Sequence, residues 1–444
     1  LLADGMSSFN TQMLPGKGRC ALASRDLAAG EVVLSEEPWA IVLLPEQQGV
    51  RCDYSLKCAE KLLRCPSTGL CFAGKEDQKR AADFYYKAEL EIAAARRKAA
   101  TAVKGSDANC TPWSWPTYLR LTCRALQRGV KNRTQPWLNL ESHWEDLTSS
   151  KQQELHESAA RCLDVLAASM GLLGGEEDAM TEAKQAFQAV ANLGDVARLL
   201  AAMEVNAMTV TDEELREIAL GLYVQGAIFH HHEEPNCIQS FVGRTLVIRT
   251  SKTIKKGDEL CITYMELGQL SCVRHALLLR HFHFSVPKTP EVEQRDRMLT
   301  TICRGPDWRP LPCGIGWDAS QGLLVEDEGD KDAEIFVSKV HQLWSQGKWQ
   351  SAWKEGTSGS LFRLGGGHAL RLALAREIMD ESIAQQKWQE ALVFAREVCS
   401  CHRQIYPAGW PVVALGLARL AKLESYHGNF VEALRCCDQA LSGA

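Results

Sequence analysis

The sequence predicts an α+β protein, in which small antiparallel sheets are split by a helical insert and followed by an all-α domain. Short runs of alternating apolar residues, bounded by glycine turns, occur near the N-terminus and again between residues 204 and 264. Helical spacing of apolar residues dominates the part between residues 75 and 203. From Ala333 onward a helix-turn-helix pattern recurs about every 40 residues, as in tetratricopeptide-like domains.

Composition narrows the class of protein. The chain has 444 residues, a formal charge of −5 and 17 cysteines. This mild charge gives no reason to expect direct nucleic-acid binding. An odd number of cysteines without a regular framework predicts reduced thiols in the cytoplasm and/or nucleus. The sequence has no apolar run of transmembrane length and no signal-peptide pattern, so we expect no membrane association. It lacks an initiator methionine, which is compatible with a fragment.

The first β segment contains a Lys17-Gly18-Arg19 turn, followed by the β-branched run Leu27–Leu34. A glycine at position 18 lets the backbone approach a ligand more closely than a residue with a Cβ would. Taken alone, such a turn is more typical of an ordinary hairpin than of a ligand site.

Four cysteines follow in the stretch between residues 52 and 71. They are Cys52, Cys58, Cys65 and Cys71. Structural zinc sites usually draw their ligands from close Cys-x2-4-Cys pairs, and the gaps here are wider. We expect at most one irregular zinc site, and the alternative is that these cysteines are buried small residues.

The helical insert leads into a second β segment. Helices are expected at residues 75–104, 119–126, 155–170 and 176–203, with a break at Thr111–Pro116 after the first of them. A strand at residues 205–210 carries Asn206 near its start, and Thr211–Glu214 resembles the N-terminal cap of a helix at residues 212–223. An asparagine at a strand start is, by itself, ordinary turn chemistry.

The stretch Phe229–Tyr264 is the most informative part of the chain. A hairpin is predicted at residues 240–249, and a Gly-Asp-Glu turn at residues 257–259 leads into a strand that ends at Tyr264. The run from His230 to Glu234 is rich in metal-binding side chains. On an extended segment, however, only His230, His232 and Glu234 point to one side, and no downstream ligand completes such a site.

In this order, the segments resemble the SET and MYND family of protein-lysine methyltransferases. That family carries Asn-His-Ser-Cys-x-Pro-Asn where this chain has residues 230–236, and the chain keeps the histidine, the proline and the final asparagine. The resemblance implies the knot-like SET fold with small sheets, an inserted MYND module and a C-terminal helical domain. The boundaries we expect are 1–50 for the N-terminal SET segment, 51–116 for a degenerate MYND-like insert, 117–203 for the helical insert, 204–286 for the core and post-SET segment, 287–332 for a linker and 333–444 for the tetratricopeptide-like domain.

The resemblance also implies the site residues. Tyr264 would be catalytic, and Phe284 would lie against the adenine of S-adenosylmethionine. The other residues implied to contact this cofactor are Lys17, Gly18, Arg19, Asn206, His230 and His231. No metal ligand is expected among them.

Three departures from the family pattern bear on activity and metal content. His230 replaces an asparagine amide, and an imidazole offers fewer hydrogen-bonding groups in a different geometry. Glu233, Val286 and Lys288 stand where the family has the cysteines of its post-SET zinc, so we expect that zinc to be absent. The MYND-like insert cannot supply the eight ligands that its two zinc ions need.

The resemblance implies an S-adenosylmethionine-dependent lysine methyltransferase acting on a histone or non-histone protein. The alternative is a non-catalytic SET-fold pseudo-enzyme that acts as a scaffold through its C-terminal repeats. In both cases we expect a monomer whose partners are proteins.

Overall fold

The computed structural model describes residues 7–102, 116–170, 187, 188, 190, 192–305, 307, 309–312, 315–318, 322–325, 330–407 and 409–442. The chain forms two compact units. The first comprises the chain up to His230, Gln239–Cys261 and His281–His283, and the second comprises His231–Ile238, Ile262–Arg280 and the chain from Phe284. Among the described helices, none is long and apolar enough to cross a membrane.

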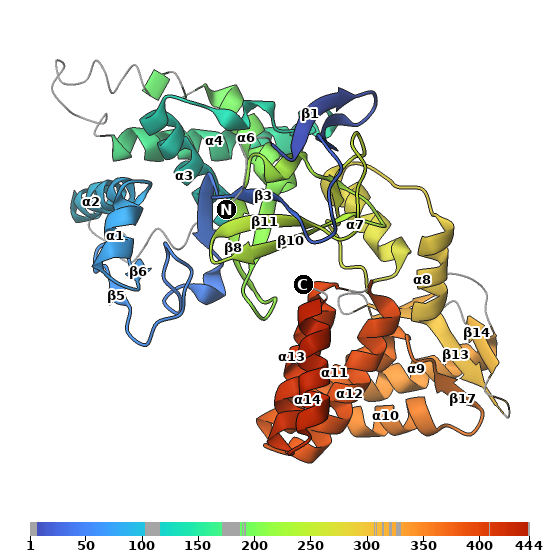
Figure 1. Cartoon of the computed structure of the whole chain (residues 1–444). Helices are drawn as coiled ribbons and strands as arrows, with labels where there is room; N and C mark the ends of the chain where they lie inside the picture. The colour runs from blue at the N-terminus through green and yellow to red at the C-terminus, as the bar shows by residue number, and fades with distance from the viewer. Residues whose placement is uncertain are drawn as a thin grey trace, which may run out of the picture. The chain divides into compact units, whose positions relative to one another are not determined.

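Small antiparallel sheets form the framework of the first unit (Figure 1). A hairpin joins β1 (Phe9–Leu14) to β2 (Gly18–Ala23). Two three-stranded sheets have the strand orders β10-β11-β3 and β4-β8-β7. Their strands are β3 (Val32–Glu36), β4 (Ala40–Leu43), β7 (Ala207–Thr211), β8 (Glu217–Leu222), β10 (Cys237–Val242) and β11 (Thr245–Thr250). Short strands of this unit are β5 (Leu63–Arg64) and β6 (Cys71–Phe72), and β9 (His230–His231) and β12 (Cys261–Ile262) each have their first residue in this unit and their second in the other. The predicted hairpin at residues 240–249 is therefore confirmed.

The predicted helix at residues 212–223 is wrong, because residues 217–222 form β8. This strand lies in the middle of its sheet, and all of its residues from Ile218 to Leu222 are buried. Burial on both faces explains the continuous apolar run. The carboxylate of Asp212 accepts hydrogen bonds from the backbone N–H groups of Glu214 and Arg216, at 3.0 Å each. The sequence that resembles a helix cap thus forms a tight turn.

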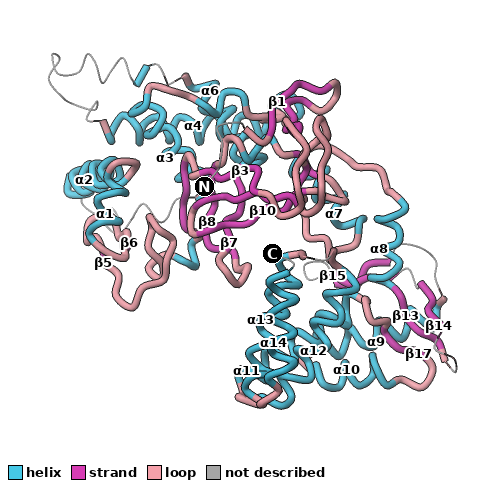
Figure 2. The backbone as a smooth tube through the Cα atoms, viewed as in Figure 1, coloured by secondary structure: helices cyan, strands magenta, loops and turns pink. Residues whose placement is uncertain are grey.

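Helices cover the β4-β8-β7 sheet, as Figures 1 and 2 show. They are α3 (Thr117–Asn132), α4 (Ser149–Ser169) and α6 (Leu193–Asn206), whereas α1 (Lys75–Ala82) packs against β6 and α2 (Tyr86–Ala102) against α4. Short 3-10 turns are Pro45–Gln47, Pro136–Asn139, Trp144–Asp146 and Gly226–Ile228. Leu121, Leu155 and Leu199 of α3, α4 and α6 share one core with Val42 and Leu222 of the sheet. The sheet is thereby held by helices whose apolar faces it buries.

Two helix predictions differ from the structure in detail. The helix predicted at residues 75–104 is divided into α1 and α2, and Tyr85 between them is buried. Part of the helix predicted at residues 176–203, and nearly all of the break at Thr111–Pro116, lie outside the described residues. The strand predicted at residues 205–210 begins at Ala207, since Asn206 ends α6.

The second unit has secondary structure where a linker was predicted. Helix α7 (Ser271–Phe282) is followed by α8 (Pro290–Thr300) and β13 (Thr301–Arg304). Strand β13 lies between β14 (Arg309–Pro312) and β17 (Phe362–Leu364), and β15 (Ile315–Asp318) pairs with β16 (Gly322–Val325). Val292, Leu299 and Ile302 are fully buried, so the described part of residues 287–332 is folded rather than a linker.

The C-terminal helices form the predicted repeat. They are α9 (Lys331–Ser345) with α10 (Trp349–Ser358), α11 (Ala369–Ala384) with α12 (Trp388–Ile405) and α13 (Pro411–Tyr426) with α14 (Phe430–Ser442). Trp349, Trp388 and Phe430 each begin the second helix of a pair. Figure 1 shows these helices side by side. The helix-turn-helix prediction for residues 333–444 is therefore confirmed.

The turns between paired helices permit a test of this arrangement. Gly428 and Gln386 occupy corresponding turns with φ of +78° and +59°. We expect Gly428→Ala to lower the free energy of unfolding by about 1 kcal/mol, because an L-residue is strained in the left-handed region. Gln386→Gly, which relieves the same strain, is the matched control and should not destabilise. Denaturant unfolding measures both variants, and equal destabilisation by the two would contradict this account.

Candidate active site

In the second unit, three of the predicted site residues lie together. The ring centroids of His231 and Tyr264 are 5.5 Å apart, those of His231 and Phe284 are 6.1 Å apart, and those of Tyr264 and Phe284 are 6.5 Å apart. His231 is the last residue of β9, and the backbone N–H of the next residue, His232, donates to Ile262 O at 2.8 Å. The structure thus brings together two residues predicted to hold the cofactor and the one predicted to be catalytic.

The imidazole of His231 has a defined orientation. Its Nδ1 accepts a 3.0 Å hydrogen bond from the backbone N–H of Tyr264. Since that nitrogen is an acceptor, the neutral ring carries its proton on Nε2. Nε2 lies 3.6 Å from Oε1 of Glu233, slightly beyond hydrogen-bond distance. The side chain of His231 is fully buried, so the ring can hold the backbone of Tyr264 in place.

A buried ion pair lies behind this ring. Oε2 of Glu233 contacts Nη2 of Arg274 and accepts a 3.1 Å hydrogen bond from its Nε, and the guanidinium is fully buried. His275 Nε2 lies 3.2 Å from Oε1 of the same carboxylate. Burial by itself would raise the pKa of Glu233, but the contacts with His231 and Arg274 outweigh it and lower that pKa to about 2. Glu233 is therefore ionised and anchors both His231 and α7.

Two predicted cofactor residues belong to a second group, in the first unit. Lys17 Nζ lies 2.6 Å from Oε2 of Glu259, and His230 Nδ1 lies 2.9 Å from Oε1 of the same carboxylate. Cys20 Sγ is 3.5 Å from His230 Nδ1. Burial would raise the pKa of Glu259, but Lys17 and His230 lower it, while the hydrogen bond to Glu259 raises the pKa of Lys17. Sequence reasoning missed Glu259, although it recognised the Gly-Asp-Glu turn that carries it.

Gly18 lies at the start of β2 with φ of +80°. A Cβ built on it would meet no atom within 4 Å. The backbone of this turn therefore adjoins open space that a ligand can enter, and the left-handed conformation explains the glycine.

Arg19 and Asn206 hold one segment of the helical insert. Arg19 Nη2 donates to Asn139 O at 2.5 Å, and Asn206 Nδ2 donates to Glu141 O at 2.7 Å and to Ala202 O at 2.8 Å. Both amide donors of Asn206 are thus engaged, and Oδ1 is the atom it can offer as an acceptor. These two residues have structural partners as well as the predicted ligand role.

The four cysteines of the MYND-like insert do not converge. In the described part of the chain, no three of Cys52, Cys58, Cys65 and Cys71 bring their thiols close enough to share an ion. Cys52, Cys65 and Cys71 are buried and Cys58 is exposed, and Cys52 Sγ donates to Asp77 at 3.2 Å. Three of the four cysteines thus fit the alternative interpretation of buried small residues, and Cys58 does not.

The residues near His230 and the former zinc positions have other partners. Nδ1 of His232 accepts the backbone N–H of Glu234, and the Glu234 carboxylate pairs with Arg295. Lys288 Nζ lies 3.4 Å from Asp296 Oδ2. His232 and Glu234 are therefore already engaged within the protein.

Comparison with known proteins identifies the family. The SET domain matches residues 18–265, more than half of the chain. The chain belongs to the SET-domain family. Histone-lysine N-methyltransferase SMYD3 of Mus musculus is 23% identical over 431 residues, covering 95% of this chain and 88% of that protein. Histone-lysine N-methyltransferase ASHR1 of Arabidopsis thaliana is 23% identical over 458 residues, with the same two coverages. N-lysine methyltransferase SMYD2-B of Danio rerio is 24% identical over 292 residues, covering 64% of this chain and 60% of that protein.

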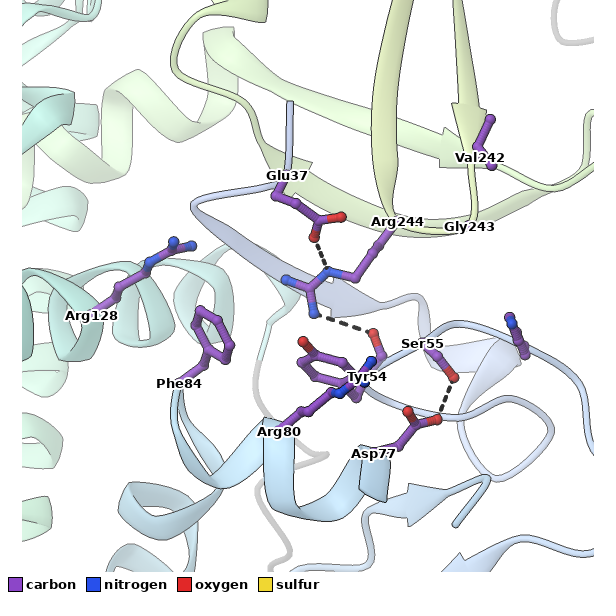
Figure 3. A pocket seen from close by; sticks show the side chains of 11 residues that line it. Glu37, Tyr54, Ser55, Asp77, Arg80, Phe84, Arg128, Val242, Gly243 and Arg244 are labelled. Atoms are coloured by element: carbon purple, nitrogen blue, oxygen red, sulfur yellow. Dashed lines mark hydrogen bonds and ion pairs between the residues drawn. The ribbon is translucent and has the colours of Figure 1, made fainter. Parts of the chain in front are cut away.

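The SET domain also contains a pocket that the sequence analysis missed. Figure 3 shows this cavity of about 500 Å³ beside the tip of the β10–β11 hairpin. Its charged lining residues are Lys57, Arg80, Arg128, Arg244, Glu37 and Asp77. With four cationic and two acidic side chains, the pocket carries an excess of positive charge. None of the site residues predicted from the sequence lines it.

Two of the cationic side chains of this pocket, Arg244 and Arg128, have defined partners. The Arg244 guanidinium lies 4.5 Å from the Tyr54 ring centroid, and its Nε is 2.8 Å from a Glu37 oxygen (Figure 3). Arg128 donates to the carbonyl oxygens of Pro38 and Trp39. Burial and the neighbouring Arg244 lower the pKa of Arg128. In the sequence, Arg244 was recognised only as part of a hairpin turn.

Proposed function

We propose that this SET-domain protein transfers a methyl group from S-adenosylmethionine to a lysine side chain of a protein substrate. Two findings support this proposal. The SET-domain match covers the predicted site residues except Lys17, which precedes it, and Phe284, which follows it, and the similarity to lysine methyltransferases extends over most of the chain. The grouping of His231, Tyr264 and Phe284 is the single observation in the structure that supports it most.

The chemistry of the residues present fits this cofactor. When bound, S-adenosylmethionine supplies a methyl group on a cationic sulfonium. Lys17 and Arg19 offer positive charge to its carboxylate, and Glu259 offers negative charge to its amino group. Open space beside the Gly18 backbone leaves room for its amino-acid part. Phe284 offers an aromatic face to its adenine.

The protein side chains would act mainly by positioning. A lysine amine attacks only when neutral, and its ordinary pKa is about 10.4. A partly buried aromatic surface, such as that of Tyr264 and Phe284, and a neighbouring cation both lower such a pKa. The hydroxyl of Tyr264 would orient the amine, and His231 would hold the backbone of Tyr264. Asn206 and His230 would assist in holding the cofactor.

His230 provides a test of the cofactor assignment. We expect His230→Asn to tighten S-adenosylmethionine binding about 3- to 10-fold, because the amide adds hydrogen-bonding capacity worth about 1 kcal/mol. Isothermal calorimetry on the purified chain measures the dissociation constant. His232→Asn is the matched control, since His232 is given no part in binding, and its affinity should equal that of the wild type. Weaker binding by His230→Asn would show that the imidazole is itself a required contact.

The substrate would be a histone or a non-histone protein, as the names of the similar methyltransferases suggest. The C-terminal helix pairs resemble tetratricopeptide units, which commonly present surfaces to other proteins, and they would bind partners or substrate. The described cysteines form no disulfide, in keeping with a location in the cytoplasm and/or nucleus. Methylation of a protein array by the purified chain, with size measurement in solution, tests substrate class and the expected monomer.

A further inference from the structure

Three side chains that commonly bind transition metals converge in the first unit. Cys20 lies on β2, His230 begins β9, and Glu259 follows the turn at Gly257. Cys20 Sγ is 3.5 Å from His230 Nδ1, which is 2.9 Å from Glu259 Oε1. All three ligand atoms lie within 4.8 Å of one another, and no other such group occurs in the described part of the chain.

The backbone holds two of these residues in register. Leu22 and Glu259 form an antiparallel bridge, and Leu260 N–H donates to Ala21 O at 2.8 Å. Cys20 and Glu259 are therefore carried by hydrogen-bonded segments rather than by loose loops. This pre-organisation reduces the conformational entropy that a bound ion would have to fix.

One ring nitrogen of His230 faces both of its partners, and the Cys20 thiol also faces Gly18 O at 3.6 Å. Both Cys20 and Glu259 approach the same nitrogen, Nδ1. A single ring nitrogen either donates or accepts, so it cannot donate to Glu259 and accept from Cys20 together. An ion, in contrast, uses all three ligand atoms at once.

The spacing agrees with tetrahedral coordination. Zinc binds thiolate at about 2.3 Å and imidazole or carboxylate at about 2.0 Å, which places sulfur and nitrogen about 3.5 Å apart and nitrogen and oxygen about 3.3 Å apart. The first separation matches the 3.5 Å observed, and the second requires an opening of a few tenths of an ångström from 2.9 Å.

We propose that Cys20, His230 and Glu259 form a binding site for a zinc-type divalent ion. The thiol of Cys20 releases its proton to solvent when the metal–sulfur bond forms. Cys20 is fully buried, whereas the side chains of His230 and Glu259 are 26% and 16% exposed. The fourth coordination position therefore faces the exposed side, where a water molecule completes the tetrahedron.

The positive charge of Lys17 predicts how a substitution at this position changes metal affinity. Its ammonium pairs with Oε2 of Glu259 at 2.6 Å, while Oε1 faces His230. A cation beside the site opposes a divalent ion, and the Lys17 side chain is 57% exposed and free to move into solvent. Lys17→Met should therefore strengthen metal binding, although it removes a proposed cofactor contact.

This site also has a consequence for activity, which rests on the proposed function. Because His230 would serve both the ion and S-adenosylmethionine, the two ligands compete. A metal ion of this kind would act as an inhibitor that the cofactor displaces. Metal binding itself is independent of whether the chain is a methyltransferase.

Cobalt titration of the reduced full chain, without cofactor, tests the site directly. Wild-type protein is expected to bind one equivalent of Co²⁺ that Cys20→Ser lacks, with a thiolate-to-cobalt charge-transfer band and the visible bands of four-coordinate cobalt. His230→Asn and Glu259→Gln should weaken that equivalent at least 10-fold, in keeping with loss of one of three ligands. Cys272→Ser removes an exposed thiol outside the site and is the control for unspecific binding.

Each outcome decides the proposal. Identical cobalt spectra and stoichiometry for wild type and Cys20→Ser would overturn it, as would weaker metal binding by Lys17→Met. Circular dichroism identifies a variant that fails to fold, and Glu259→Gln then replaces Cys20→Ser in the comparison. Calorimetry of S-adenosylmethionine with and without Zn²⁺ is a separate measurement. Cobalt binding without cofactor binding would uphold the metal site and contradict the proposed function.

Discussion

Tyr264→Phe is expected to lower kcat for lysine methylation about 10²- to 10³-fold while leaving S-adenosylmethionine affinity nearly unchanged. The hydroxyl is the only group that the substitution removes, and the phenyl ring can keep its place against His231 and Phe284. Loss of one positioned group typically costs about 3–4 kcal/mol of transition-state stabilisation. The measurement is the initial rate of methyl transfer to a lysine peptide at saturating cofactor, together with calorimetry of cofactor binding.

Tyr426→Phe is the matched control for this substitution. Tyr426 lies at the end of α13 and is 66% exposed, so loss of its hydroxyl should alter neither rate nor affinity. If Tyr264→Phe methylates as fast as the wild type, the role assigned to Tyr264 is wrong. If the wild-type chain itself binds cofactor but methylates no substrate, the scaffold alternative gains support.

The C-terminal repeat could be predicted because its signal is local. Trp349, Trp388 and Phe430 recur at nearly equal spacing, and each begins the second helix of a pair after a turn of positive φ. Such a pattern can be recognised from residues that are close together in the sequence. The ring of Trp388 lies 5.3 Å from that of Tyr426, on a helix of the next pair.

The turn at Asp212 and the ion pair of Glu233 depend on residues far away in the sequence, so the local pattern did not predict them. Asp212 stands in a sequence that resembles a helix cap, but its side chain closes a turn. The apolar run that follows forms β8, the central strand between β4 and β7. From the sequence, Glu233 was recognised as standing where the family pattern has a zinc-ligating cysteine, but its ion pair with Arg274 was not predicted. Its partner Arg274 is 41 residues away, and no short-range pattern links the two.

Glu233→Gln is expected to lower the free energy of unfolding by about 3–5 kcal/mol. The substitution leaves the fully buried guanidinium of Arg274 without its counter-charge, and an uncompensated buried charge costs about this much. In the family pattern this position belongs to a zinc-ligating cysteine. Here the position holds a buried ion pair, so we expect the stability of this region to depend on that pair. Removal of metal by a chelator should therefore leave this part of the fold intact.

The same carboxylate makes stability depend on pH. The pKa of Glu233 is lowered from 4.5 to about 2 in the folded protein. Because the folded-state value is depressed, the contribution is fully present above about pH 4.5 and is lost as the pH falls toward 2. A shift of this size corresponds to about 3 kcal/mol. Wild-type stability should thus fall steeply between about pH 4.5 and pH 2, and the profile of Glu233→Gln should be flatter in that window.

Denaturant unfolding at a series of pH values measures both effects. Asp26→Asn is the control, because Asp26 and its partner Lys255 are 60% and 73% exposed and such surface pairs contribute little. Equal midpoints for Glu233→Gln and wild type at pH 7 would mean that Arg274 finds another acceptor, such as the carbonyl oxygen of Gln269 that it already contacts. Parallel pH profiles for the two proteins would assign the acid sensitivity to other carboxylates. A flatter profile for the variant alone would identify the Glu233–Arg274 pair as the source of the acid sensitivity.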